Sequence, residues 1–215
     1  MMDYPPWLNR IQCIWGQDPL NIYCGGRAGA IFRVRDTTWE RLDTGTNLDI
    51  MDIWGGTDPL TGNEEILAVA FSPLLPEPPV LLRISGSTVS QIPTDGIRGY
   101  IAGVWFVPNR WYMAVGENIQ TKKKEVTAGP WLTEVGALAP GRGKSSVRGN
   151  SRDDFMVGTF APIIGHYNGV TWQEWNFPEI TRIPRLYFSG NRAAAAANAG
   201  GSYAFVLLGI RKDTE

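Results

Sequence analysis

The sequence predicts an all-β protein that forms a single β-propeller domain over residues 1–215, most simply with five four-stranded blades. Short apolar runs alternate with turn residues along the chain, and 25 Gly with 15 Pro supply the turns that many short strands need. The elements Trp-Gly and Asp-Pro-Leu also recur, with Trp15 and Trp54 lying 39 residues apart. Repeat units of about 40–50 residues with four short strands each are the sequence signature of a propeller.

The first four repeat units each contain apolar runs that suit four strands. A Pro-rich stretch, Ser72 to Pro79, interrupts the second unit and is predicted to be a surface loop, because Pro cannot donate to a strand ladder. The expected strand regions lie within 14–26, 30–33 and 37–42, then at 49–54, 65–70, 80–84 and 88–92, then at 103–107, 111–116, 119–126 and 129–135, and finally at 146–149, 154–158, 163–167 and 169–175.

The fifth unit has three recognisable strands, at 185–190, 192–201 and 202–211. Its Ala-rich middle segment has high helix propensity, but five alanines are too few for a stable isolated helix, and the repeat register favours a strand over a helical turn. The segment 6–8 resembles 130–132, so the N-terminus is a candidate for the missing outer strand. A propeller that stays open or is completed by a partner is the alternative.

Tryptophan is unusually frequent, with nine residues, and most have a structural place in the repeat. Trp39, Trp131 and Trp172 open outermost strands, whereas Trp15 and Trp54, together with Trp105, end innermost ones. Blade packing explains these positions better than an aromatic ligand platform does.

The pattern Trp-Gly-x-x-Asp, Gly-x-Ile-x-Arg and Thr-Trp resembles the repeat of poorly characterised bacterial β-propellers related to the Asp-box and Kelch-like groups. The segment 169–172 is similar to the end of an Asp box, but Tyr167 and Val34 stand where the acid of that box belongs. The resemblance therefore implies the fold and not sialidase chemistry.

Composition excludes strong general attraction to nucleic acid or membranes. The net charge is −1 and the pI is about 5.9, so any electrostatic partner must meet a local patch. The N-terminus lacks a signal-peptide pattern and no apolar run is long enough to span a membrane, which predicts a soluble protein. Cys13 and Cys24 are expected on adjacent strands, as two buried thiols or as a cross-strand disulfide. The sequence does not indicate the compartment or the oligomeric state.

Catalytic patterns are sparse. A five-bladed glycosidase needs a pair of suitably spaced carboxylates at the channel, and the predicted inner strands offer only Asp49 and Asp52. His166 is the sole histidine, which argues against a multi-histidine metal site, so neither a metal nor a cofactor is predicted. The sequence favours a non-catalytic binding module, and the alternative is a carbohydrate-active hydrolase or lyase.

The binding site is predicted at the channel mouth, where the loops between blades converge. We expect Arg98, Arg142, Lys144 and Arg148 on its positive side and Trp105 as an apolar floor. Because arginine offers several donors to carboxylates and phosphates, the expected ligand is a protein segment or a glycan of acidic character. Each of these charges is also explained by simple solvation of a loop.

Overall fold

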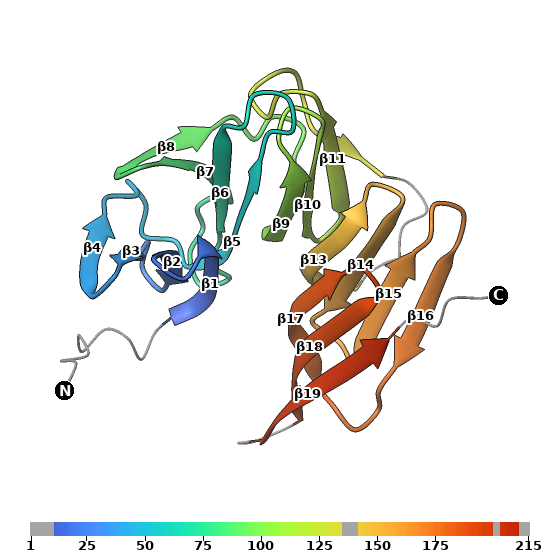
Figure 1. The fold of residues 1–215 in the computed structure, drawn as a ribbon. Coiled ribbons are helices and arrows are strands. Elements are labelled where there is room, and N and C mark those ends of the chain that lie inside the picture. The colour runs from blue at the N-terminus through green and yellow to red at the C-terminus, as the bar shows by residue number, and fades with distance from the viewer. Residues whose placement is uncertain (1–10, 135–141, 200–202, 211–215) are drawn as a thin grey trace.

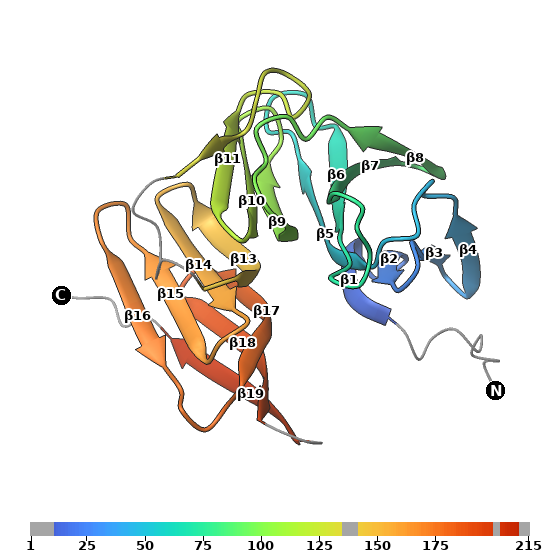
Figure 2. The same ribbon diagram turned by 180° about the vertical axis from the view of Figure 1, so that it is seen from behind.

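The computed structural model describes residues 11–134, 142–199 and 203–210, the side chains of 203–205 excepted. Within this part of the chain every regular element is a β-strand, and the strands form five antiparallel sheets. The sheets follow one another along an arc, with blades 1 and 5 at its two ends (Figures 1 and 2). The predicted five-bladed β-propeller is therefore confirmed.

Blades 1 to 4 are simple meanders in which each strand pairs with the next along the chain. Their boundaries lie close to the predicted runs. The strands are β1 (Ile11–Asp18), β2 (Asn21–Gly26), β3 (Ile31–Arg35) and β4 (Thr38–Leu42) in blade 1; β5 (Ile50–Thr57), β6 (Glu64–Ala70), β7 (Val80–Ser85) and β8 (Thr88–Ile92) in blade 2; β9 (Ile101–Val107), β10 (Trp111–Gly116), β11 (Ile119–Lys123) and β12 (Leu132–Thr133) in blade 3; and β13 (Lys144–Ser151), β14 (Asp154–Thr159), β15 (Ile163–Tyr167) and β16 (Trp172–Asn176) in blade 4.

Blade 5 has three strands in the described residues, β17 (Arg182–Ser189), β18 (Arg192–Ala199) and β19 (Tyr203–Ile210). The Ala-rich segment is strand β18, as the repeat register predicts, and the alternative of a helical turn is wrong. Ala195 and Ala197 are buried in a cluster with Met156 and Ile164 of blade 4. Tertiary packing thus overrides the helix propensity of alanine.

The opposite face of blade 5 is apolar and open to solvent. Val206, Leu208 and Ile210 alternate along β19 with exposed fractions of 72%, 81% and 72%, and Tyr187 of β17 is 56% exposed. No strand of the described residues pairs with the outer edge of β19. The predicted completion of this blade by residues 6–8 lies outside the described residues.

The core consists of side chains packed between neighbouring blades, and the repeated tryptophans belong to it. Trp15 of β1 lies against Gly55 of β5, where an added Cβ would come within 2.3 Å of the indole Cη2. Trp105 of β9 approaches Gly149 of β13 in the same way, because a Cβ added at Gly149 would lie 2.5 Å from the indole Cη2 of Trp105. Gly55, which follows Trp54, and Gly149, which follows Arg148, therefore both admit an indole of the preceding blade.

The repeated Asp-Pro-Leu sequence forms the turn between the first and second strands. Asp18 Oδ1 accepts a hydrogen bond from Leu20 N at 2.8 Å, and Asp58 Oδ1 accepts one from Leu60 N at 2.9 Å. This Asx turn replaces a backbone turn interaction with a side-chain acceptor. The bond from the Leu60 amide, followed by those from Thr61 and Asn109, holds the pKa of the Asp58 carboxyl below its ordinary value.

Cys13 and Cys24 are both free and buried. Cys13 is paired with Gly25 and Cys24 with Ile14, so the two thiols lie on opposite faces of the β1–β2 hairpin. The disulfide considered from sequence is therefore absent from this structure. Burial raises the pKa of the Cys13 thiol to about 12.

The three lysines at 122–124 do not all serve as solvated edge charges. Lys123 and Lys124 are exposed, whereas Lys122 is buried and its Nζ donates to Val126 O at 2.9 Å. The ammonium also lies 5.4 Å from the centroid of the Trp131 ring. Burial lowers the pKa of Lys122.

Candidate binding site at the mouth of the channel

Two sets of loops meet on the same face of the propeller. In an antiparallel meander the turn between the second and third strands lies at the end where the first strand begins. The loop that enters each blade from the preceding one lies at that end too. We call this face the mouth; in blades 2 to 4 it comprises the loops 43–49, 71–79, 93–100, 117–118, 142–143 and 160–162.

Three aromatic side chains from these loops form a continuous row. Phe71 follows β6, Tyr100 precedes β9 and Phe160 follows β14, so three different blades contribute. The rings of Phe71 and Tyr100 stack with centroids 5.0 Å apart, and those of Tyr100 and Phe160 are 6.2 Å apart. Phe160 is 40% exposed. We call these three residues the mouth row.

The backbone around Tyr100 fixes the row in place. Tyr100 O accepts a hydrogen bond from Glu117 N at 3.1 Å, and Phe160 N donates to Gly143 O at 2.9 Å. The phenol of Tyr100 lies so close to Gly143 that a Cβ there would be 1.8 Å from the hydroxyl oxygen. Burial, and next the nearby Glu117 carboxylate, raises the pKa of Tyr100, so its hydroxyl is a neutral donor and acceptor at neutral pH.

Two of the predicted cations are available at this face. Arg142 is exposed next to Gly143, and Arg98 is exposed two residues before Tyr100. Gln120 fixes the backbone of Arg98 by accepting from its N at 3.1 Å and donating to its O at 3.0 Å. Both arginines are therefore exposed in loops that carry the mouth row, and the backbone of Arg98 is anchored by Gln120.

Lys144 is held in the interior instead of facing a ligand. It is 4% exposed, and its Nζ donates to Glu117 O at 3.2 Å. Burial lowers its pKa, against the opposing influence of the Glu117 carboxylate. Lys144 thus ties the start of β13 to the β10–β11 loop below the mouth row.

Arg148 joins three blades near the axis. Its Nη1 and Nη2 donate to Asp52 Oδ2 and Oδ1 at 2.9 and 2.7 Å, and Asp52 Oδ2 also accepts from Val104 N at 3.1 Å. The guanidinium lies 4.5 Å from the centroid of the Trp54 ring. The side chains of Arg148 and Asp52 are only 9% and 2% exposed. We call Arg148 and Asp52 the hub pair. The guanidinium of Arg148 thus donates its hydrogen bonds to groups inside the protein.

Trp105 is also a packing residue in this structure. It is 3% exposed and lies edge-on to Trp111, with ring centroids 4.5 Å apart. It therefore does not form an exposed floor of the mouth. Of the five predicted site residues, the structure presents Arg98 and Arg142 to solvent and buries Lys144, Arg148 and Trp105.

A hollow of about 620 Å³ lies on the same face beside blade 1. Leu75 and Glu77 of the Pro-rich loop form one side, and residues 41–48, from the end of β4 and the loop that follows it, form most of the other. Leu74, in the same loop, is 89% exposed. The Pro-rich loop therefore extends the accessible apolar surface of the mouth.

The two acids that the sequence predicts on an inner strand, Asp49 just before β5 and Asp52 within it, are engaged in structural contacts. Asp49 accepts from Ala28 N at 3.0 Å and from Gln12 Nε2 at 3.3 Å, and Asp52 belongs to the hub pair. His166 Nε2 lies 2.7 Å from Asp154 Oδ1. Among the described residues, no group of three or more His, Cys, Asp or Glu is arranged to hold a metal ion. The described part of the chain also contains no helix that could span a membrane.

Sequence reasoning missed the mouth row. Phe71, Tyr100 and Phe160 occupy loop positions that do not repeat in spacing, so no periodic pattern marks them. The available signal was that each follows or precedes a strand at the same end of its blade. Aromatic residues at those positions of three units would have indicated a shared surface.

Solved structures support the fold. A structure of YCF48 bound to D1 peptide is 15% identical to this chain, with a TM-score of 0.62, over 99% of this chain and 68% of that one. YCF48 from Cyanidioschyzon merolae is 14% identical, with a TM-score of 0.60, over 96% and 71%. The computationally designed protein Ika8 is 13% identical, with a TM-score of 0.54, over 87% and 55%.

At these identities the likeness shows the β-propeller fold alone. This chain spans 55% to 71% of the length of the three structures. No family model and no curated protein matches the sequence. The resemblance to bacterial Asp-box and Kelch-like repeats stays a prediction.

Proposed function

We propose that this chain is a non-catalytic binding module that holds an acidic peptide segment of a protein partner across the mouth. The observation that carries this proposal is the mouth row, in which loops of three blades bring Phe71, Tyr100 and Phe160 into contact. Arg98 and Arg142 are exposed beside it. Aromatic rings supply rigid contact area and arginines supply forked donors for carboxylates.

Two further observations favour binding over hydrolysis. The carboxylates of Asp49, just before β5, and of Asp52 in β5 accept hydrogen bonds from groups within the protein. A structural neighbour, YCF48, has been solved with D1 peptide bound, which supports peptide binding as a use of this fold. Function belongs to the site and not to the fold, so the mouth row and its arginines are the parts to test.

The test measures fluorescence anisotropy with a panel of labelled peptides that share aromatic residues and differ in the number of Asp and Glu. Acidic peptides should bind more tightly than their Asn and Gln counterparts. Added salt should weaken the binding of the acidic peptides, because exposed charges are screened. A sulfated or carboxylated oligosaccharide in the same assay tests the glycan alternative.

Variants then locate the site. Arg142→Ala should lower the affinity for the tightest-binding acidic peptide up to about fivefold, which is the contribution of an exposed ion pair. Phe160→Ala should also weaken it, and the loss should persist at high salt because the contact is apolar. Arg110→Ala is the matched control, since Arg110 is exposed in the β9–β10 turn at the other end of its blade. Equal effects of Arg142→Ala and Arg110→Ala would reject the proposed site.

A further inference from the structure

A second cleft, separate from the mouth row, lies between blades 3 and 4. Its volume is about 280 Å³, just below the ~300–1,000 Å³ typical of ligand pockets. Such a volume suits one side chain better than a large ligand. It shares no lining residue with the mouth row or the hub pair.

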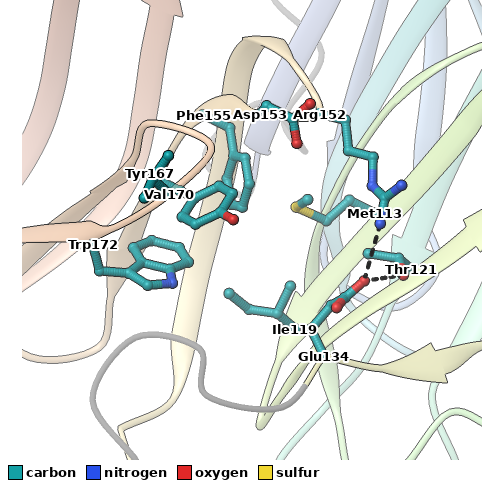
Figure 3. A pocket seen from close by; sticks show the side chains of 10 residues that line it. All are labelled: Met113, Ile119, Thr121, Glu134, Arg152, Asp153, Phe155, Tyr167, Val170 and Trp172. Carbon is teal, nitrogen blue, oxygen red and sulfur yellow. Dashed lines mark hydrogen bonds and ion pairs between the residues drawn. The ribbon is translucent and has the colours of Figure 1, made fainter.

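One wall of this cleft is aromatic. Phe155, Tyr167 and Trp172 of blade 4 have ring centroids 5.3–5.5 Å from one another, so they pack as a continuous surface. Figure 3 shows these rings on one side of the cleft and Met113 with Ile119 of blade 3 facing them. This part of the cleft suits an aliphatic chain.

The rim is polar and carries an excess of negative charge. Glu134 and Asp153 are carboxylates, and Arg152 is the one cation among the lining residues, which gives a formal charge of −1. Thr121 donates to Glu134 Oε1 at 2.6 Å and so orients that carboxylate. Figure 3 shows Thr121 and Arg152 both directed toward Glu134.

The existing ion pair at the rim leaves Glu134 able to accept a further donor. Arg152 Nη2 is 3.9 Å from Glu134 Oε1, and the two side chains are 48% and 43% exposed. Such a long and exposed pair contributes little. A compact ammonium has three donors and can approach Glu134 beside the aromatic wall, and Asp153 adds to the negative charge of the cleft.

We propose that this cleft binds a lysine side chain of a peptide segment from a protein partner. The four-carbon stem lies along the aromatic wall and the ammonium meets the Glu134 and Asp153 rim, as amphipathic side chains commonly divide between apolar and polar surroundings. Val170, 85% exposed at the rim, offers an apolar contact for the rest of the segment. This inference does not depend on the proposed function of the mouth.

The experiment uses NMR titration of the full chain, following the indole N–H resonance that disappears in Trp172→Phe. The probe is lysine blocked at both ends, Nα-acetyl-lysine N-methylamide. Two blocked controls are Nε-acetyl-lysine, which lacks the charge, and norleucine, which keeps only the stem. We expect the lysine probe to shift the Trp172 resonance at concentrations at least about threefold lower than either control.

Variants separate charge recognition from general apolar binding. Glu134→Gln should weaken the lysine probe up to about fivefold and leave norleucine binding unchanged, and adding Asp153→Asn should weaken it further. Glu125→Gln is the matched control, because Glu125 is exposed in blade 3 and does not line the cleft. Equal shifts by lysine and norleucine, no shift by lysine, or equal effects of the two single Glu→Gln variants would each overturn the proposal.

Discussion

The hub pair should be the most sensitive electrostatic element of the fold. We consider Asp52→Asn, Arg148→Met and the double variant. Asp52→Asn keeps the shape and the acceptor for Val104 N but removes the charge that faces the guanidinium. Arg148→Met leaves a carboxylate that is 2% exposed without its two strongest donors.

Each single substitution should lower the free energy of unfolding by about 3–5 kcal/mol, the usual cost of removing one member of a buried ion pair. For a domain of this size, one kcal/mol corresponds to about 2–4 °C in Tm, so each variant should melt about 6–20 °C lower. The double variant removes both charges together. It should therefore cost at least about 2 kcal/mol less than the sum of the single variants.

Urea unfolding followed by circular dichroism and by tryptophan fluorescence measures these differences. Peptide binding at the mouth should be unchanged at temperatures where the variants stay folded, because Arg148 directs its donors inward. Additivity within about 0.5 kcal/mol would show that the two side chains are not coupled. A loss below about 1 kcal/mol for Arg148→Met would refute the buried-pair reasoning.

Three smaller perturbations test other parts of the fold. The free energy of unfolding should fall as the pH rises above about 9, because burial raises the Cys13 pKa from 9.0 to about 12 and the thiol therefore ionises first in the unfolded chain. At ~1.36 kcal/mol per pKa unit, the largest loss of stability is about 4 kcal/mol. Urea titrations at several pH values should show that Cys13→Ala flattens this dependence on pH. Gly55→Ala should cost about 1–3 kcal/mol because the new methyl group meets Trp15, and an unchanged Tm would contradict that packing. Lys122→Ala should lower the free energy of unfolding by about 1–3 kcal/mol, whereas Lys123→Ala should change it by less than about 0.5 kcal/mol. Similar melting temperatures for the two variants would argue against a structural role for Lys122.

The strand order could be read from the sequence because each blade is a local meander. The spacing of apolar residues and the identity of turn residues are local properties of the sequence. Asp18 and Asp58 show that the repeated Asp-Pro-Leu tripeptide forms the same turn twice. The strand in the Ala-rich segment was also predictable, but only from repeat register. Its composition alone favours a helix, and the sequence does not show the packing against blade 4 that settles the matter.

The candidate site was less accessible to sequence reasoning. Arg148 is a residue type that often binds acidic ligands, yet in the structure its partner is Asp52, 96 positions earlier in the chain. Along an inner strand the side chains alternate between neighbouring blades and the axis, and a shift of one residue exchanges these environments. The sequence correctly placed Arg148 near the axis but could not determine whether a ligand or Asp52 would neutralise it.

Arg185 has a consequence for how the chain folds. Its Nη2 donates to Gln12 O at 2.9 Å and also to Met51 O, so β17 of blade 5 is bonded to the first strands of blades 1 and 2. Repeat arrays held only by neighbour contacts can fold and fray one unit at a time. Bonds across 173 and 134 residues form only after the intervening chain has been arranged, which raises contact order and slows folding. The same bonds link the unfolding of the last blade to that of the first two, so loss of blade 5 by fraying should be resisted from the opposite end of the chain.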